Sequence, residues 1–231
     1  MKYKLLTITG FLAVFIFYIS ILIYWGTSIG AFLSGGAIWF IGVSIKGVIW
    51  SFWEKWAKDR WEKRQRKARN TIQGVAAGVI GAIGELGVTC AFFLVFTHYA
   101  SDRNWLLGMG IGAGLVEAFF IFLAALYSLF SKSDDNSQQN HSILLSLVSP
   151  FERFYTTGMH WAVRYLVAQS IATTSLIPFS IAFVSFAFAD GFAHYAVLHW
   201  DLEKRQSLFI LEGILCLNAL LVVSLTLFFS M

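Results

Sequence analysis

The chain of 231 residues is 58% hydrophobic and only 13% charged, carries a formal net charge of +4, and contains 23 Phe and 9 Trp. This composition excludes a soluble single domain, because one core of that size leaves a large accessible surface that so many apolar side chains cannot avoid. Its apolar runs of about 20 residues fit membrane-spanning helices rather than the short alternating strands of a barrel. We therefore expect an all-α, polytopic transmembrane bundle that forms a single domain over residues 1–231.

Seven hydrophobic segments follow one another along the chain. We expect spans at residues 5–25, 28–50, 73–97, 105–130, 151–174, 177–199 and 207–230. The first segment is longer than a signal-peptide core, and no small-residue cleavage site precedes the next span, so we interpret it as a retained helix. Cys90 and Cys216 fall inside apolar runs, which argues against a disulfide framework. Pro150 and Pro178 are expected where helices begin, since a missing N–H costs nothing there.

The third span opens with four glycines, Gly74, Gly78, Gly81 and Gly84, spaced four and three residues apart. Residues at these spacings share one face of a helix. Small residues on a face let the backbone of a neighbouring helix approach closely. The glycine face therefore predicts helix packing rather than chemistry.

The longest polar interruption reads EKWAKDRWEKRQRKAR over residues 54–69, with eight basic and three acidic residues. The positive-inside rule places this segment in the cytoplasm, and Lys2, Lys132 and Lys204 then fall on the same side. With seven spans, the N-terminus is internal and the C-terminus external. We expect a basic cytoplasmic juxtamembrane loop over residues 54–70 whose partners are membrane lipids with anionic headgroups, and no nucleic-acid partner.

Ionisable residues inside spans are the best functional indication in this chain, because charge is costly in the membrane. Five acidic residues lie in or at the edge of spans, joined by three histidines and an arginine: Glu85, Glu117, Glu152, Asp190, Glu212, His160, His194, His199 and Arg164. Glu117 and Glu85 lie roughly 18–20 Å from the cytoplasmic ends of their helices at about 1.5 Å per residue. By the same count His160 and Asp190 lie about 13–14 Å deep, and His194 about 8 Å deep.

Three different helices thus bring Glu117, His160 and Asp190 to similar depths, which predicts a shared polar cavity that opens toward the cytoplasm. The alternative is purely structural. Buried acids can pair with Arg164, and a protonated Glu85 can donate a hydrogen bond between helices.

Three segments on consecutive helices carry a family resemblance: GIGAGLVEA at 110–118, ERFYTTGMH at 152–160 and ADGFAH at 189–194. They resemble the motifs of the YhfC-type glutamic intramembrane proteases, which are grouped with PrsW and the CAAX-prenyl-protease-like membrane enzymes. The resemblance covers roughly residues 70–200. It implies that the helices within residues 105–200 hold the active site and that the protein lies in a bacterial or archaeal cell membrane.

The resemblance also implies roles for single residues. Glu117 would be the base that activates water. His160 would orient the water or stabilise the oxyanion, and Asp190 would hold a histidine or the substrate backbone. Glu152 and Arg153 would brace the helix of the second motif at the mouth of the cavity.

The chain departs from the family pattern at two positions. Ala113 stands where the first motif carries a histidine, and Phe186 stands where a histidine precedes Asp190 by four residues. His194, four residues after Asp190, lies on the same helix face and can partly substitute. Zinc is conceivable with Glu117, His160 and His194 as ligands, but HExxH or a comparably tight spacing is lacking, so we expect no metal or other cofactor.

The sequence therefore favours a divergent intramembrane protease that hydrolyses peptide bonds of a membrane protein or peptide with a Glu-activated water. Two other classes stay open. One is a non-catalytic membrane scaffold or partner subunit of the same fold. The other is a small proton- or cation-coupled transporter, although the inverted repeat of many carriers is absent from the sequence.

Overall fold

The computed structural model describes residues 2–61, 66–130, 143–202 and 204–230, and everything within these ranges that is regular is helical. The elements are α1 (Lys2–Tyr24), α2 (Ile29–Trp61), α3 (Arg66–Val95), the short 3₁₀ helix η1 (Thr97–Ser101), α4 (Arg103–Phe130), α5 (Ile143–Thr173), α6 (Leu176–His199) and α7 (Arg205–Ser230). The expected all-α transmembrane bundle is confirmed, and the protein is an integral membrane protein.

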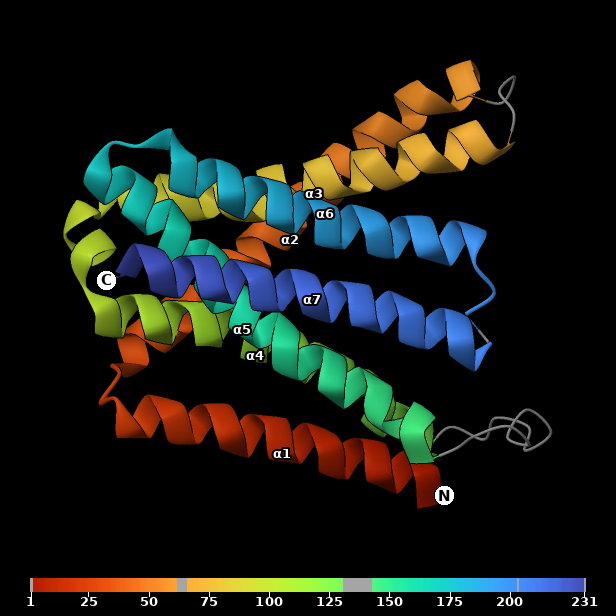
Figure 1. Ribbon diagram of the computed structural model, residues 1–231, viewed down its shortest axis with the longest axis horizontal. Helices are drawn as coiled ribbons and strands as arrows, with labels where there is room; N and C mark the ends of the chain where they lie inside the picture. Colours follow the sequence, from red (N-terminus) through yellow and green to blue (C-terminus); the bar gives the residue numbers. More distant parts are fainter. Residues whose placement is uncertain (1, 62–65, 131–142, 203, 231) are drawn as a thin grey trace.

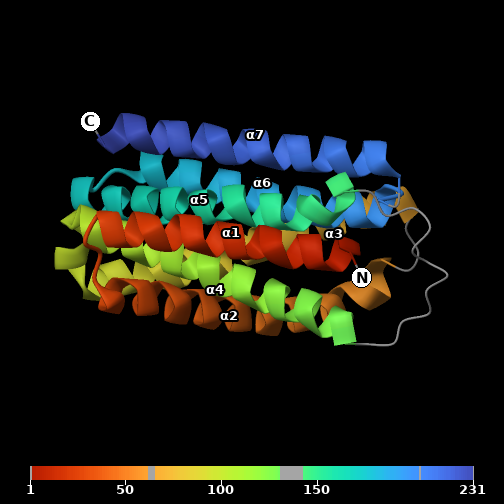
Figure 2. The same cartoon turned by 90° about the horizontal axis from the view of Figure 1, so that it is seen from below.

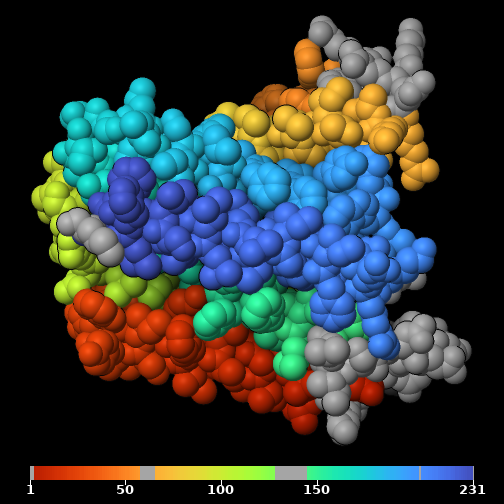
Figure 3. Space-filling view, in the orientation of Figure 1, coloured from red at the N-terminus to blue at the C-terminus, as the bar shows by residue number. Residues whose placement is uncertain are grey.

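The helices run back and forth through the bundle (Figures 1 and 2). The N-terminus and the α6–α7 turn lie at one end, and the α1–α2 and α5–α6 turns lie at the other end with the C-terminus (Figure 1). The positive-inside rule assigns the first of these ends to the cytoplasm. At this end α2 and α3 bend away from the other helices and project from the side of the bundle, at the upper right of Figures 1 and 3.

Helix α5 is the central helix of the bundle. It packs against α1, α3, α4, α6 and α7. The other six helices are each long and apolar enough to cross a membrane, whereas α5 carries too many polar groups to qualify by composition. Three of these groups, Arg153, His160 and Arg164, are buried in the protein. Neighbouring helices therefore shield them from lipid, which is where charged side chains are tolerated in a membrane.

Helix α5 begins at Ile143, so the expectation that a helix starts at Pro150 was wrong. Proline lacks the N–H that would bond to the carbonyl of Ser146, and Thr7 Oγ1 of α1 donates to that oxygen at 2.8 Å instead. Gly10 of α1 lets the two helices approach closely there, since a Cβ atom at Gly10 would lie 2.8 Å from Pro150 Cγ. Pro178 does lie in the first turn of α6, as expected.

The basic segment 54–70 is helical on both sides of its middle. Residues 54–61 continue α2 and residues 66–70 form the start of α3, while residues 62–65 lie outside the described residues. The polar connector at 131–142 also lies outside them. The two described parts of the basic segment therefore lie along the projecting ends of two spanning helices.

Glycines set the closest helix contacts. A Cβ atom at Gly35 of α2 would overlap the carbonyl oxygen of Met109 on α4, and one at Gly112 of α4 would overlap the carbonyl oxygen of Phe32 on α2. The predicted glycine face of α3 is used in the same way, since a Cβ atom at Gly74 would lie 2.9 Å from Tyr195 Cβ of α6. Backbones meet at these points without intervening side chains, as is common in membrane bundles.

Gly112→Ala is expected to lower the free energy of unfolding by about 1–3 kcal/mol, because the added methyl group must push α2 away from α4. Gly87→Ala on α3 is the matched control, since no atom lies within 4 Å of a Cβ atom there. Reversible unfolding of the purified protein in detergent measures both. Equal stability of the two variants would show that the α2–α4 contact is not close-packed.

Candidate functional site

Glu117 and His160 meet where α4 crosses α5. The glycine-rich part of the first motif makes this crossing close, because a Cβ atom at Gly114 would lie 2.6 Å from the Cα atom of Thr157. Glu117 lies one turn beyond Gly114, and its Oε2 atom is 2.6 Å from Nε2 of His160. The two residues that the motifs single out on separate helices are therefore in direct contact.

Arg153 holds the other oxygen of Glu117. Its Nη1 donates to Glu117 Oε1 at 2.5 Å, and its Nη2 donates to Glu152. Arg153 lies seven residues before His160, two turns along α5 and on the same face. Both donors that fix the Glu117 carboxylate therefore come from the helix that carries the second motif, and Glu152 balances the guanidinium charge.

Arg164 determines which ring nitrogen of His160 carries the proton. Its Nη1 lies 2.8 Å from Nδ1 of His160. A guanidinium can only donate, so Nδ1 must accept with its lone pair. The proton of the neutral imidazole is then on Nε2, and it points to the Glu117 carboxylate.

Glu85 of α3 lies behind this pair. Its Oε2 atom is 3.9 Å from both Nδ1 of His160 and Nη2 of Arg164. Neither Glu85 Oε2 nor Arg164 Nη2 has a hydrogen-bond partner among the described residues, and both side chains are buried. Glu85 is therefore the carboxyl group that lies beside the buried guanidinium.

These groups surround a polar cavity of about 280 Å³. Its walls come from α2 to α7: Trp39, Val43, Lys46, Glu85, Glu117, Glu152, Arg153, Tyr155, Thr156, Met159, His160, Phe186, Ala189, Asp190, Ala193 and Leu215. We call this space the polar cavity. Glu117, His160 and Asp190 share it, as the depth count along the sequence predicts.

Lys46 of α2 is a member of the cavity that the sequence interpretation missed. Its Nζ atom lies 2.5 Å from Oδ2 of Asp190 on α6. Helices α2 and α6 do not pack on each other, because α3 lies between them and packs on both. The long lysine side chain therefore reaches across α3. A lysine within the apolar stretch IGVSIKGVIW was the sequence signal, since charge in a span is costly.

Gly81 of α3 leaves room for this ion pair. A Cβ atom there would overlap Oδ2 of Asp190. Gly81→Ala is expected to lower the free energy of unfolding by about 1–3 kcal/mol. In an Asp190→Ala background, where the carboxylate is absent, the same change should cost little. A double-mutant cycle on the purified protein measures the difference, and equal losses in both backgrounds would disprove the contact.

His194 lies outside the polar cavity. It lines a neighbouring cavity of about 440 Å³ together with Trp50, Ala77 and Val197, and its ring centroid is 5.3 Å from that of Trp50. Lys46, Asp190 and Ala193 line both cavities. The Lys46–Asp190 pair therefore stands between the two spaces, with His194 on the far side from Glu117.

The two departures from the family pattern lie close to the site. Ala113 is fully buried on α4. Phe186 lines the polar cavity, and its ring centroid is 6.0 Å from that of His160. A phenyl ring thus packs beside His160 at the position where the family carries a second imidazole.

The residues do not fit a zinc site. Within the described residues no group of three or more His, Cys, Asp or Glu side chains is placed to hold a metal ion. Both ring nitrogens of His160 face other groups, Glu117 and Arg164, and His194 lies in the neighbouring cavity. No step of the chemistry below uses a metal.

Comparison with protein-family models, with curated proteins and with solved structures finds no match to this chain. The resemblance to glutamic intramembrane proteases therefore rests on the three motifs.

Proposed function

We propose that the protein is a divergent glutamic intramembrane protease of the YhfC type, which hydrolyses peptide bonds in the polar cavity with Glu117 as the base. The observation that supports this most is the contact of Glu117 with His160 at 2.6 Å inside a cavity built from six helices. The polar cavity holds a carboxylate, a histidine with a fixed tautomer and two cations around a space that admits water. Metal-free peptide hydrolysis needs these parts.

The carboxylate of Glu117 has room for a water molecule. Arg153 and His160 use one lone-pair position on each oxygen, whereas a carboxylate offers about four. Its side chain is 27% exposed, so it is not sealed by these partners. A cavity of about 280 Å³ also exceeds the roughly 30 Å³ that one water occupies.

In the proposed reaction Glu117 takes a proton from this water as the water oxygen attacks the peptide carbonyl carbon. A C–O bond forms and the carbonyl oxygen becomes an oxyanion, which the guanidinium of Arg153 and the ammonium of Lys46 would stabilise from the wall of the cavity. Glu117 then gives the proton to the amide nitrogen as the C–N bond breaks. His160 keeps its proton on Nε2 and orients the carboxylate throughout.

The substrate would be a membrane protein or a peptide inserted in the membrane, and the motifs point to a bacterial or archaeal cell membrane. An extended peptide must reach the cavity. The Lys46–Asp190 pair lines both cavities, so movement of these two side chains on substrate entry would join the polar cavity to the neighbouring one.

Specific observations also favour the other two classes. A non-catalytic subunit is favoured by Phe186 beside His160 and by the buried Ala113, which replace two family histidines. A proton or cation relay is favoured by the alternation of acidic and basic groups from Glu152 to Glu85 through the cavity. Catalytic turnover separates the protease from both.

The test is incubation of the purified protein in lipid vesicles with a panel of membrane-inserted peptides, with products identified by mass spectrometry. Cleavage within the inserted segment supports the protease. Absence of cleavage by folded protein, with pH-driven uptake of a cation into the same vesicles, would instead support the relay. If neither peptide cleavage nor cation uptake is observed, the result supports the non-catalytic subunit.

A further inference from the structure

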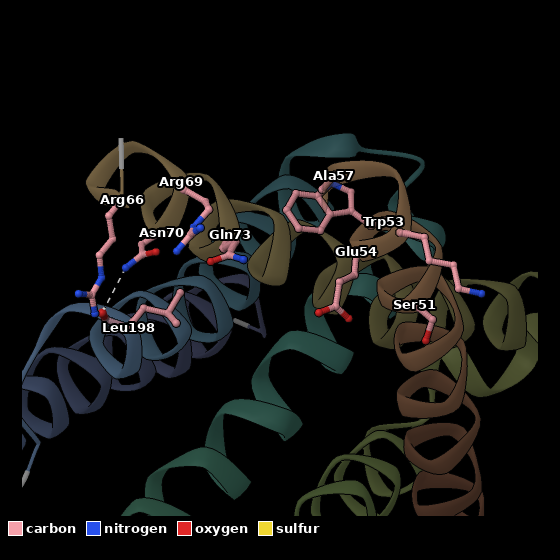
Figure 4. Close-up of a pocket in the computed structure, with 10 residues that line it drawn as sticks. Ser51, Trp53, Glu54, Ala57, Arg66, Arg69, Asn70, Gln73 and Leu198 are labelled. Atoms are coloured by element: carbon pink, nitrogen blue, oxygen red, sulfur yellow. Dashed lines mark hydrogen bonds between the residues drawn. The ribbon is translucent and has the colours of Figure 1, made fainter. Parts of the chain in front are cut away.

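A third pocket, of about 670 Å³, lies between the projecting ends of α2 and α3 (Figure 4). Its walls are Ser51, Trp53, Glu54, Lys55 and Ala57 of α2, Arg66, Arg69, Asn70 and Gln73 of α3, and Leu198 of α6. We call it the basic pocket. It shares no lining residue with the polar cavity.

The basic pocket exists because α2 and α3 touch near their middles and then separate. At the point of contact, a Cβ atom at Gly84 would lie 2.7 Å from the carbonyl oxygen of Gly42. Toward its start α3 follows α6 instead, where Asn70 Nδ2 donates to the carbonyl oxygen of Leu198 at 3.3 Å. The end of α2 is left apart from α3, as Figure 4 shows, and the pocket fills the space between them.

The polar groups of the pocket suit an anion. Arg66, Arg69, Asn70 and Gln73 follow the i, i+3, i+4, i+7 spacing of a single helix face. Among the described residues, they bring with Lys55 three cations and two amides to the pocket, against the one carboxylate of Glu54. Arginine forks and amide N–H groups are strong donors to phosphate oxygens.

The position of the pocket identifies the source of the phosphate. Leu198 belongs to the last turn of α6, so the pocket lies at the level where the spanning helices end. Trp53 lies in its wall, and tryptophan favours this interfacial level. Phe52 is exposed at the level of the pocket, and Val48 of α2 and Val75 of α3 are exposed further into the membrane, so an apolar surface is available to acyl chains. We propose that the basic pocket binds the phosphate headgroup of an anionic phospholipid.

This proposal is independent of the protease proposal, and native mass spectrometry of lipids retained by the purified protein tests it. The protein is offered equal amounts of phosphatidylglycerol and phosphatidylcholine in detergent. Wild type is expected to retain phosphatidylglycerol preferentially. Arg66→Gln with Arg69→Gln should weaken this retention roughly twentyfold, since a basic group near an anionic lipid contributes about a fivefold factor.

Two further variants separate a specific pocket from general charge. Lys204→Gln with Arg205→Gln removes two charges at the same membrane side, away from the pocket, and should leave retention within about twofold of wild type. Glu54→Gln removes the one opposing carboxylate and should strengthen retention about fivefold, which a misfolded protein would not do.

Three outcomes would overturn the proposal. The first is equal retention of the two lipids by wild type. The second is an equal loss of phosphatidylglycerol retention in the Arg66→Gln, Arg69→Gln variant and in the Lys204→Gln, Arg205→Gln control. The third is full displacement of the lipid by millimolar inorganic phosphate. The last outcome would assign the pocket to a soluble phosphate compound instead.

Discussion

Glu117→Gln is expected to lower the rate of cleavage of a membrane-inserted peptide by about a hundred- to ten-thousand-fold, which is the usual contribution of a general base. The amide of glutamine cannot take a proton from water. It also offers one acceptor where Arg153 and His160 each require one, so the water would lose both its base and its fixed position. Initial rates of peptide cleavage in vesicles, corrected for the folded fraction, measure the effect.

Glu212→Gln is the matched control for this variant. Glu212 is also a buried carboxyl group, and it accepts a hydrogen bond from Tyr155 at 2.6 Å, but it does not line the polar cavity. A glutamine oxygen can accept the same bond, so Tyr155 keeps its place in the cavity wall and the rate should stay within about threefold of wild type. Equal losses in the two variants would remove Glu117 from the role of base.

The fold was predictable because its determinants are local. Runs of apolar residues give spanning helices wherever they occur, and the boundaries that differ do so for a physical reason. Helix α5 continues through Pro150 because Thr7 of a distant helix donates to the carbonyl oxygen of Ser146, in place of the N–H that proline lacks. No pattern near residue 150 carries that information.

The meeting of Glu117, His160 and Asp190 in one cavity was predictable from their depth, since depth follows from the number of residues along a spanning helix. The rotation of each helix about its axis was harder to predict. His194 shares a helix face with Asp190, yet the Lys46–Asp190 pair stands between His194 and the polar cavity that holds Glu117. That division depends on how α2 lies relative to α6, which the sequence of α6 does not encode.

Two basic residues, Lys46 and Arg164, organise the site in ways that the sequence does not show. Lys46 is the one charged residue in the span expected at 28–50, which marks it as a candidate, but its partner on α6 was not predictable from the sequence. Arg164 was considered as a structural partner of buried acids, and it does face Glu85. Its bond to Nδ1 of His160 adds a second role, because it fixes the proton that faces Glu117.

Arg164→Met is expected to lower the free energy of unfolding by about 3–5 kcal/mol, the usual result of removing one member of a buried charged pair. Arg164 is fully buried, and its loss leaves the Glu85 carboxyl without an opposing charge and His160 Nδ1 without a donor. Arg164→Met combined with Glu85→Leu removes both charges and should recover at least half of the loss. Unfolding of the single and double variants in detergent measures this, and a double variant less stable than Arg164→Met would exclude the pairing.

The double variant also separates the two roles of Arg164. Its stability should recover, but nothing would then hold Nδ1 of His160 as an acceptor, so the ring would populate both neutral tautomers. The ¹⁵N shifts of His160 should change from a single Nε2–H form to a mixture, and peptide cleavage should stay about tenfold or more below wild type, as for a loss of about 1.4 kcal/mol of transition-state stabilisation. A stable double variant with wild-type cleavage would mean that Arg164 serves folding alone, whereas recovered stability without recovered cleavage identifies it as the positioning residue for the Glu117–His160 pair.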